Sequence, residues 1–298
     1  MVMKFLVTGS SGLIGSQLIK DLTEKDFNVY SCYNTLQPEF GHPILLDLND
    51  LSNIATTVRK IEPDVIIHLA ALTNVDLCEK EKNLATKINV DATKILLQCI
   101  SSQTFFLYVS TDYVFDGQKG MYNELSPTNP INFYGKTKRE GESAVLNSAK
   151  NSCIVRTSTP FGLHNQKKSF PIWVVENLRQ NHQIKVPMDQ YTSPTYVPNL
   201  CKMLVEITTK QITGILHLAG ETRISRYEFA KLITNKMHLD YDLIKPVSLT
   251  DMHWVAQRPK DSSLDISKAK PILQEKPLDI HQSLSRLYGL KHETEKIV

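Results

Sequence analysis

The 298-residue sequence has few cysteines, no long apolar run and almost no excess of one charge. Its five cysteines are an odd number without a CxxC pair, so neither a disulfide framework nor a zinc site is expected. The longest uncharged apolar stretch, 65–72, is far shorter than the roughly 20 residues of a membrane-spanning helix. The first residues run directly into a strand-like segment, which leaves no room for a secretory signal. We therefore expect a cytoplasmic protein with no metal site and no membrane partner.

The charges nearly balance, because 34 Lys and Arg face 31 Asp and Glu, for a formal net charge of +3. The chain has no basic run, so nothing favours a nucleic-acid partner. Hydrophobic residues make up 41% and charged residues 22%, which excludes a disordered or fibrous chain. The length fits one large α/β domain or two smaller ones, and we expect a monomer or a homodimer.

Strand and helix patterns alternate through the first half of the chain. Continuous apolar segments predict buried strands at 4–8, 64–69 and 105–109, and helical spacing follows each of them. A long helix is predicted over 81–102. This alternation predicts an α/β fold, a doubly wound parallel sheet of the Rossmann type.

After about residue 158 the alternation loosens and prolines interrupt the chain. The expected elements are short: helices at 173–180, 199–209, 226–237 and 281–289, and strands at 183–186 and 214–218. We assign 1–158 to a dinucleotide-binding domain that is completed by about 196–218. Residues 159–195 and 219–298 are assigned to a smaller C-terminal substrate-binding cap.

A glycine-rich turn lies between the first predicted strand and helix. Gly9, Gly12 and Gly15 are spaced GxxGxxG in the segment TGSSGLIGSQL. Glycines there permit a tight turn and let backbone N–H groups approach a pyrophosphate at the helix N-terminus. The alternative is an unoccupied strand-to-helix turn. The expected cofactor contacts of this turn are Gly9, Ser11, Gly12, Leu13, Ile14 and Gly15.

Two further segments supply acid–base chemistry. Tyr134 and Lys138 form a YxxxK pair, whose side chains lie one turn apart on the same face of a helix. An ammonium close to the phenol lowers the tyrosine pKa from its ordinary value of about 10, toward what a general acid–base needs. Thr111, with Ser110 beside it, ends a predicted strand and can donate its hydroxyl to a substrate carbonyl. The alternative for the pair is a solvated helix face.

The glycine turn, the strand-end hydroxyl and the YxxxK pair, in this order, resemble the extended short-chain dehydrogenase/reductase superfamily. The resemblance implies an adenine site at Asp47 and Leu48, and a nicotinamide-ribose site at Leu69, Ala70 and Ala71. It adds Asn89, Ser110, Tyr134 and Lys138 as cofactor contacts. By itself, Asp47 is equally well explained as a helix or turn cap.

Five segments make the resemblance more specific. They are STDYVFDG, the stretch 130–142, Arg156-Thr-Ser158, the stretch 189–195, and Arg258-Pro259 before SSL. Together they resemble the dTDP-4-dehydrorhamnose reductase family over nearly the whole chain. The resemblance implies reduction of the 4-keto group of dTDP-4-dehydro-L-rhamnose, with NADPH or NADH, to dTDP-L-rhamnose.

The same resemblance implies the roles of individual residues. Tyr134 protonates the C4 oxygen, Lys138 tunes Tyr134, Thr111 orients the carbonyl, and the nicotinamide delivers hydride. The expected substrate contacts are Thr111, Asp112, Thr159, Trp173, Gln190 and Arg258. Arg258 suits the pyrophosphate because a guanidinium forks onto phosphate oxygens, and a surface salt bridge is the alternative.

The sequence departs from the family at two places. Family members commonly carry tryptophan after Arg-Thr-Ser, where this chain has Thr159, so that Trp173 or Trp254 would have to compensate. Between Asn28 and Phe40 the only charged residue is Glu39. Without a nearby carboxylate nothing repels a 2′-phosphate, so NADP(H) is favoured, with NAD(H) as the alternative.

Two other functions stay open at this point. The regulatory β subunit of methionine adenosyltransferase resembles this reductase family, binds NADP and acts as a partner subunit. A sugar-nucleotide epimerase or dehydratase would use the same fold, although Tyr113 follows Asp112 where dehydratases carry Glu. His68 lies inside a predicted strand with no partner at metal-ligand spacing, and we expect a core histidine.

Overall fold

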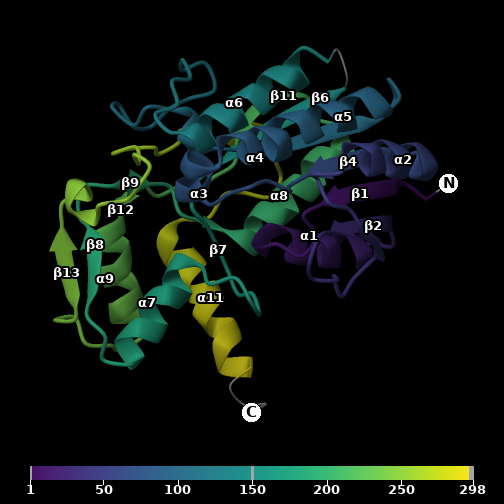
Figure 1. The fold of residues 1–298 in the computed structure, drawn as a ribbon. Helices are drawn as coiled ribbons and strands as arrows, with labels where there is room; N and C mark the ends of the chain where they lie inside the picture. The colour runs from purple at the N-terminus through teal and green to yellow at the C-terminus, as the bar shows by residue number, and fades with distance from the viewer. Residues whose placement is uncertain (1, 149–150, 295–298) are drawn as a thin grey trace.

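A seven-stranded parallel sheet forms the centre of the molecule (Figure 1). The computed structural model describes residues 2–148 and 151–294. The strands are β1 (Lys4–Thr8), β2 (Asn28–Tyr33), β3 (His42–Leu45), β4 (Val65–His68), β5 (Phe105–Thr111), β6 (Ser152–Thr157) and β11 (Gly214–His217). Their order is β11-β6-β5-β4-β1-β2-β3, so the direction of winding reverses between β1 and β4. This is the doubly wound topology that the strand–helix alternation predicts, and the predicted fold class is confirmed.

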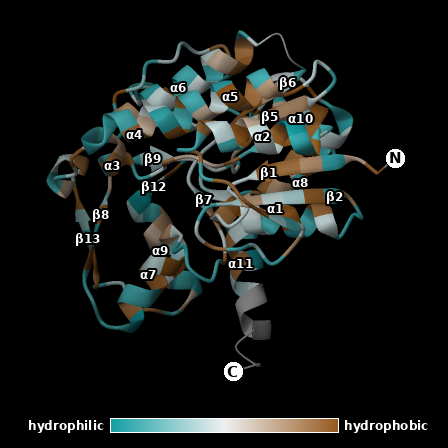
Figure 2. Ribbon diagram, turned by 45° about the vertical axis from the view of Figure 1, so that its right-hand side comes forward, coloured by the Kyte–Doolittle hydropathy of each residue, from teal (hydrophilic) through white to brown (hydrophobic). Residues whose placement is uncertain are grey.

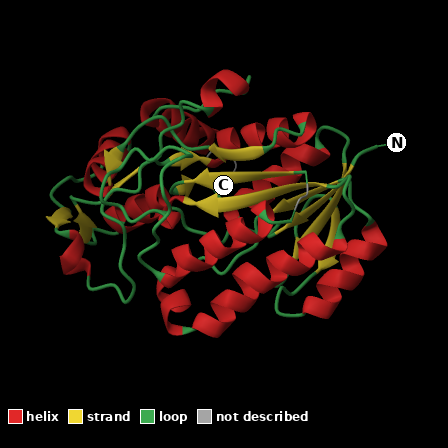
Figure 3. Cartoon of the chain, turned by 90° about the horizontal axis from the view of Figure 1, so that it is seen from above, coloured by secondary structure: helices red, strands yellow, loops and turns green. Residues whose placement is uncertain are grey.

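Helices cover both faces of the sheet (Figure 3). The helices α1 (Leu13–Thr23) and α8 (Val197–Lys210) pack on one face. The helices α2 (Leu51–Ile61), α5 (Ala92–Cys99) and α6 (Phe133–Leu146) pack on the other. Strand β5 contributes side chains to the cores on both faces of the sheet. Phe105 and Leu107 pack on the face covered by α1 and α8, and Phe106 and Tyr108 pack on the other face. Because successive side chains point to opposite faces, a central strand must be apolar throughout.

Hydropathy follows this layering. Hydrophobic residues concentrate along the central strands and on the buried helix faces (Figure 2). Within the described residues, no helix is long and apolar enough to cross a membrane.

The helix predicted over 81–102 is interrupted. It consists of α4 (Lys82–Thr86), one π-helical turn at Lys87–Asp91, and α5. The π turn holds Asn89, which is buried and directs its amide toward the loop after β4. Such turns recur at functional positions, because the extra residue re-aims a side chain without ending the helix.

A smaller layer lies beside the sheet, at the left of Figure 1. Its core is formed by α7 (Phe170–Arg179), α9 (Arg226–Lys236), α11 (Ile280–Thr294) and the parallel strands β8 (Ile184–Pro187) and β13 (Ile244–Val247). Short pairings connect it to the rest, namely β7 (Pro160–Phe161) with β10 (Thr195–Tyr196) and β9 (Tyr191–Thr192) with β12 (Ile224–Ser225). The remaining short elements are α3 (Val75–Lys80), the 3₁₀ turns η2 (Asp112–Val114) and η3 (Leu249–Met252), and α10 (Ala269–Ile272).

The predicted division into a dinucleotide-binding domain and a cap stays a prediction. One detail bears on its boundary, since Ala269 and Leu273 pack in the core beneath the sheet. Leu264 likewise pairs with Tyr122 through a β-bridge. Part of the segment assigned to the cap therefore contacts the dinucleotide-binding domain.

His68 is a buried residue of β4. Its Nδ1 lies 2.7 Å from the Thr8 hydroxyl and its Nε2 lies 3.0 Å from the Thr93 hydroxyl. Burial lowers the pKa of His68 to about 3, so the ring is neutral. Across the part of the chain that the structure describes, no group of three or more His, Cys, Asp or Glu side chains could hold a metal ion. His68 is the core histidine that its place in the sequence predicts.

A buried ion pair joins α6 to β6. Arg156 donates from Nε and Nη2 to the two carboxylate oxygens of Glu142, at 2.9 and 2.7 Å, and only 4% of each side chain is exposed. His217 on β11 lies against the same guanidinium, at 3.4 Å. Burial, with Arg156 adding to it, lowers the pKa of His217 to about 3, so no second cation competes for Glu142.

We expect Glu142→Ala to destabilise the fold by about 3–5 kcal/mol, because Arg156 would be left as an unpaired buried charge. Urea unfolding followed by circular dichroism measures the loss. Glu140→Ala on the same helix is the matched control, and its free energy of unfolding should change by less than about 0.5 kcal/mol. Equal losses in the two variants would contradict the assigned importance of the buried pair.

Candidate active site

The glycine-rich turn connects β1 to α1. Gly9 has a φ of +72°, and a Cβ at this position would lie 2.9 Å from the Ala70 nitrogen. A Cβ at Gly15 would overlap the Gly9 carbonyl oxygen. The surrounding backbone therefore leaves no room for a side chain at Gly9 or at Gly15. At Gly12 the nearest atom to such a Cβ is the Gly9 oxygen, at 3.2 Å, and the backbone there is extended. Since this is the one atom within 4 Å of such a Cβ, Gly12 is less enclosed than Gly9 and Gly15.

The other residues expected at this turn lie around it. Leu13 and Ile14 begin α1 and pack against the core of the sheet. The carbonyl oxygen of Ser11 accepts a hydrogen bond from Nε2 of His164, at 3.2 Å. Because Nδ1 of His164 accepts from the backbone of Gln166 and Lys167, the second ring nitrogen is the donor. The loop after β7 is thus fastened over the glycine turn.

The loop after β4 reaches the same edge of the sheet. Its backbone N–H groups at Leu69 and Ala70 donate to the Thr8 hydroxyl, at 3.2 and 3.1 Å, and Ala71 follows, half-buried. Asn89 holds the next residue, because its Oδ1 accepts from the Leu72 nitrogen and its Nδ2 donates to the Leu72 oxygen.

Nδ2 of Asn89 also donates to the Thr137 hydroxyl, at 3.0 Å, so both ends of this amide have partners in the protein. In this structure Asn89 therefore joins the loop to α6 rather than facing open space.

Asp47 and Leu48 follow β3. Oδ1 of Asp47 accepts from the backbone and the side chain of Asn49, at 2.9 and 3.2 Å. Leu48 is buried in the second core. The Asp47 carboxylate therefore caps a turn, which is the alternative given in the sequence analysis. The segment nevertheless lies at the carboxyl edge of the sheet, where a cofactor would bind.

Thr111, Tyr134 and Lys138 are brought together by β5 and α6. Thr111 ends β5 and lies close enough to Tyr134 to lower the pKa of its phenol, against the larger effect of burial. Asn132 caps α6 by accepting from the Gly135 nitrogen at 2.8 Å, which fixes the first turn that carries Tyr134. Nζ of Lys138 donates to the carbonyl oxygen of Val109, at 2.8 Å. The expected acid–base centre is thus assembled in one place.

Burial decides the electrostatics of this centre. It raises the pKa of Tyr134 above the ordinary tyrosine value, and the negative charge of Asp112 adds to the rise. It lowers the pKa of Lys138 to about 7, against the attraction of Glu142. The direction for Tyr134 is opposite to the one expected from the YxxxK spacing, because Lys138 is bonded to β5 and the buried phenolate lacks solvent. At neutral pH the phenol is therefore protonated, as an acid must be.

Asp112 is buried beside Thr111. Its Oδ1 accepts from the Thr111 hydroxyl at 2.9 Å, and its Oδ2 accepts from the hydroxyls of Ser158 and Ser262 at 2.7 and 2.5 Å. Burial raises the pKa of Asp112, and these hydrogen bonds oppose the rise. Ser110, also expected at the site, has a buried hydroxyl without a hydrogen-bond partner among the described residues.

A cavity of about 430 Å³ lies beside this centre and is reached through Tyr113, whose ring centre is 6.1 Å from that of Tyr134. It is lined by Tyr113, Phe170, Trp173, Lys185, Val186, Pro187, Gln190, Arg226, Met252, Trp254 and Arg258. Trp173, Gln190 and Arg258 were expected at a substrate site and lie here, whereas Thr111, Asp112 and Thr159 are not part of this lining. The combination of aromatic walls, cations and no acidic lining residue suits an anionic ligand with a flat ring.

Arg258 is already paired in this structure. Its Nη1 and Nη2 donate to the two oxygens of Asp76, at 3.1 and 3.0 Å, and its guanidinium lies 5.0 Å from the centre of the Trp254 ring. Arg258 therefore forms the salt bridge that the sequence analysis gave as the alternative. A pyrophosphate bound by Arg258, as predicted, would compete with Asp76 for the guanidinium.

Arg226 is the lining residue that the sequence analysis missed. Its guanidinium lies 4.9 Å from the centre of the Phe170 ring, and in the described part of the chain no carboxylate forms an ion pair with it. Burial lowers its pKa, while Tyr113 and Asp112 raise it. A signal was present, because Arg226 is the first residue of α9, directly after the cap Ser225. A cation is disfavoured at a helix N-terminus, so its presence there points to a role outside the helix.

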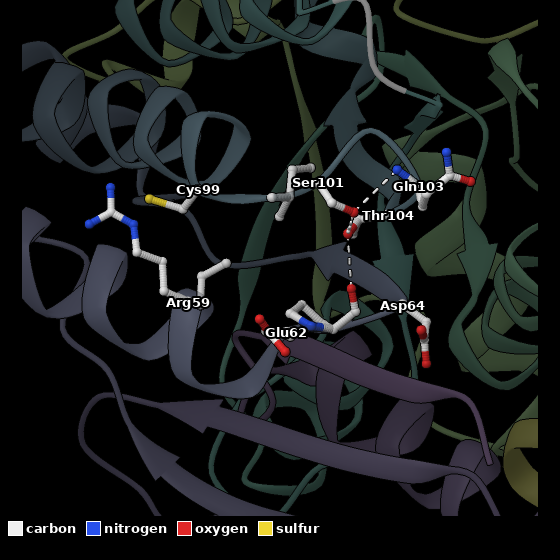
Figure 4. A pocket seen from close by; sticks show the side chains of 10 residues that line it. Arg59, Glu62, Asp64, Cys99, Ser101, Gln103 and Thr104 are labelled. Carbon is white, nitrogen blue, oxygen red and sulfur yellow. Dashed lines mark hydrogen bonds between the residues drawn. The ribbon is translucent and has the colours of Figure 1, made fainter. Parts of the chain in front are cut away.

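A second cavity, of about 390 Å³, lies at the opposite edge of the sheet, between the ends of α2 and α5 (Figure 4). Thr104 donates to the Pro63 carbonyl oxygen at 3.0 Å beside it. Asp64 and Thr104 precede β4 and β5, so this cavity faces the amino ends of the strands. In doubly wound sheets ligands bind at the carboxyl ends, which leaves the larger cavity as the candidate active site.

A family model described as the RmlD substrate binding domain matches residues 3–290. The chain belongs to the RmlD family. The predicted family and enzyme class are confirmed, since relatives at high coverage include dTDP-4-dehydrorhamnose reductases.

Two solved structures show how closely the fold is shared. A hypothetical dTDP-4-dehydrorhamnose reductase from Sulfolobus tokodaii is 38% identical, with a TM-score of 0.86 over 93% of this chain and 97% of that one. A dTDP-4-dehydrorhamnose reductase from Bacillus anthracis, solved in complex with NADP, is 29% identical, with a TM-score of 0.87 over 97% and 99%.

A relative of another functional class is similar to the same extent. The β subunit of methionine adenosyltransferase 2 from Xenopus tropicalis is 30% identical over 276 residues, which are 90% of this chain and 81% of that protein.

Proposed function

We propose that this protein reduces the 4-keto group of a nucleotide-linked deoxysugar with NADPH, and that dTDP-4-dehydro-L-rhamnose is the substrate. The observation that carries the proposal is the position of Thr111, Tyr134 and Lys138. They meet at the carboxyl edge of the sheet, between the glycine turn and a cationic, aromatic cavity. A reductase needs its acid between its hydride donor and its carbonyl substrate, and this arrangement provides it.

The residues present fit a dinucleotide. A bound pyrophosphate would use the space beside Gly12 and the N–H groups at the start of α1. The unpartnered hydroxyl of Ser110 is a buried polar group that a ligand could satisfy. Asp47, Leu48, Leu69, Ala70 and Ala71 would surround the nucleosides, and NADPH, when bound, supplies the hydride.

The chain's own residues supply the proton and the orientation. The buried, protonated Tyr134 donates to the C4 oxygen as hydride arrives at C4, which converts the ketone into an alcohol. Lys138, held by the Val109 carbonyl, would contact the nicotinamide ribose and steady the phenolate that Tyr134 becomes. Thr111 lies beside Tyr134 at the end of β5 and would orient the substrate carbonyl.

The cavity would hold the nucleotide part of the substrate. Phe170 and Trp173 lie with ring centres 5.9 Å apart and offer flat surfaces for a base. Lys185 and Arg226 form no ion pair with a carboxylate among the described residues and would balance a diphosphate, whereas Arg258 is bound to Asp76.

The deciding experiment is oxidation of NADPH and NADH by the purified protein, with dTDP-4-dehydrorhamnose generated in the same vessel. Turnover that needs both the sugar nucleotide and the protein supports the proposal. Absence of turnover, in protein that binds NADPH, would contradict the substrate assignment.

A second candidate function has specific support. The similarity to the methionine adenosyltransferase β subunit covers 90% of this chain. A partner subunit has no chemical need for Thr111, Tyr134 and Lys138, so their assembled geometry favours the reductase. Tight co-elution with a methionine adenosyltransferase catalytic subunit, without sugar-nucleotide turnover, would reverse this preference. An epimerase or dehydratase finds no such support, because Asp112 is enclosed by hydroxyls and Tyr113 replaces the Glu.

We expect Tyr134→Phe to lower the reduction rate by about 10²–10⁴-fold, because the positioned proton donor is lost. NADPH affinity and the melting temperature should stay near their wild-type values, since the ring is kept. The matched control is Tyr227→Phe, which removes a phenol that bonds only to Tyr241 at the surface. More than half of the wild-type rate in Tyr134→Phe would remove Tyr134 from its assigned role.

We expect Gly12→Val to weaken NADPH binding by at least about 100-fold, because the side chain would fill the space proposed for the pyrophosphate. Calorimetric titration of the folded variant measures this. The control Gly289→Val also adds a side chain where no atom lies within 4 Å, far from the turn, and should bind NADPH normally. Unchanged affinity in Gly12→Val would place the cofactor elsewhere.

The residue that contacts the adenosine ribose should lie at the end of β2, where Tyr33 is half-buried. Without a carboxylate there, we expect NADPH to be preferred only a few-fold, equivalent to about 1 kcal/mol or less. Tyr33→Asp should reverse the preference, because it repels a 2′-phosphate and accepts from a ribose hydroxyl. Comparing kcat/KM for both cofactors decides, with Tyr33→Asn as the uncharged control. No response to the new charge would show that Tyr33 lies away from the ribose.

A further inference from the structure

The guanidinium of Arg258 is held along one edge only. Nη1 donates to Oδ1 of Asp76 at 3.1 Å and to the carbonyl oxygen of Ala256 at 2.7 Å, and Nη2 donates to Oδ2 of Asp76 at 3.0 Å. Each Nη carries two hydrogens and Nε carries one, in a rigid plane. The Nε hydrogen and the second Nη2 hydrogen therefore have no partner among the described residues, and both lie on the edge next to the one that Asp76 occupies.

The edge without a partner is one that binds an oxyanion elsewhere in this molecule. Arg156 donates from Nε and Nη2 to the two carboxylate oxygens of Glu142, at 2.9 and 2.7 Å. The same fork fits two oxygens of a phosphate group. Arg258 lines the cavity of about 430 Å³, and no Asp or Glu is among the residues that line it. A phosphate group of a ligand is therefore the oxyanion that suits this edge.

The environment of Arg258 keeps its guanidinium in place. Asp76 is itself fixed, because its Oδ1 also accepts from the backbone nitrogen of Ala256 at 2.9 Å. Burial disfavours the ionised form of Asp76, but the N–H of Ala256 and the guanidinium outweigh burial and hold the pKa of Asp76 below its usual range. The guanidinium also lies over the Trp254 ring, 5.0 Å from its centre, and only 11% of the Arg258 side chain is exposed.

We propose that Asp76 is a positioning residue, which grips one edge of Arg258 so that the adjacent edge forms a ready fork for a phosphate group in the cavity. The proposal rests on the proposed function, since it assigns the diphosphate of the sugar nucleotide to this fork. Competition with Asp76 concerns the edge that Asp76 already holds, whereas the second edge is available without breaking a bond. A mobile arginine would lose its freedom on binding the ligand, and Arg258 has already lost it.

The negative charge of Asp76 acts in the opposite direction, because it repels the diphosphate. This repulsion is weakened by water, since 32% of the Asp76 side chain is exposed. In the proposed arrangement the guanidinium also lies between the two anions. The gain from a fixed fork should therefore exceed the repulsion.

Asp76 is not the only anchor of the segment that carries Arg258. Asn132, the N-cap of α6, donates from Nδ2 to the carbonyl oxygen of Gln257 at 2.9 Å. The segment 256–258 is thus bound to α6 as well as to α3. Loss of the Asp76 charge should leave its backbone in place, and the effect is expected at the Arg258 side chain.

The decisive variant is Asp76→Asn. Its amide keeps an oxygen for the N–H of Ala256 but turns an amino group toward Nη2, so the two-point grip on the guanidinium is lost. We expect dTDP to bind about two- to tenfold more weakly, which is the cost of fixing one long side chain. Thymidine, which lacks the phosphates, and NADPH should bind as they do to the wild type. Calorimetric titration measures all three, and in turnover KM should rise while kcat stays nearly constant.

Two further variants separate positioning from a general effect of charge. Glu81→Gln removes a negative charge from the exposed C-terminal end of the same helix, and its dTDP affinity should be unchanged. Arg258→Lys keeps the cation but has no fork, so it should weaken dTDP binding by itself. In the Arg258→Lys background, Asp76→Asn should then cost much less than it does with Arg258 present.

Three outcomes would overturn the proposal: unchanged or tighter dTDP binding in Asp76→Asn, an equal loss for thymidine and dTDP, or an equal loss with and without Arg258→Lys. Tighter binding would show that Asp76 is a competitor of the ligand. If Asp76→Asn fails to fold, unchanged dTDP affinity in Arg258→Lys overturns the proposal by itself.

The binding measurements need no keto sugar, so they separate this proposal from the proposed reaction. Binding of dTDP that depends on Asp76, without turnover of the sugar nucleotide, would contradict the reaction alone. Turnover together with dTDP binding that ignores Asp76→Asn would contradict the positioning role alone. A wild-type protein that does not bind dTDP would contradict both.

Discussion

All strands of the central sheet are parallel, so their carboxyl ends meet at one edge, and the candidate active site depends on this constraint. The glycine turn follows β1, the Leu69–Ala71 loop follows β4, and Thr111 ends β5. Segments that are more than a hundred residues apart are adjacent only because the winding reverses between β1 and β4. The cavity beside this edge is lined by Tyr113, which follows β5, and by residues between 170 and 258.

Burial at this edge determines the chemistry of the side chains. A buried phenol holds its proton more tightly and a buried ammonium less tightly, so Tyr134 and Lys138 shift in opposite directions for the same reason. Polar groups in such a place must find partners within the protein, and they do. Asp112 accepts hydrogen bonds from three hydroxyls, Lys138 donates to a backbone carbonyl, and Asn89 accepts from the backbone of the loop after β4. Ser110 and Thr157 are exceptions, because neither hydroxyl has a hydrogen-bond partner among the described residues.

Periodicity and short motifs predict the fold well, because central parallel strands must be apolar on both faces and glycine turns need particular backbone conformations. The sequence analysis therefore places β1, β4, β5 and the helices of the cap within a few residues of their observed positions. It fails where a result depends on pairing across the fold. The partner of Arg258 is Asp76, 182 positions away, and no spacing rule connects them. The pKa of Tyr134 likewise depends on its burial in the folded chain, which the YxxxK spacing does not contain.

The residues that could be predicted from the sequence and those that could not lie in different parts of the molecule. The sheet edge carries the acid–base centre, whose residues are close in sequence to strand and helix ends and are therefore visible as motifs. The cap carries the cavity, whose lining comes from α7, β8, α9 and the loop before Arg258. There Thr159 stands where relatives carry tryptophan, and Arg226 occupies a helix start that disfavours a cation. Arg226 forms no ion pair among the described residues and lies in the cavity beside Phe170, so the side chains that would select a substrate come from the cap, and those that would move the proton come from the edge of the sheet.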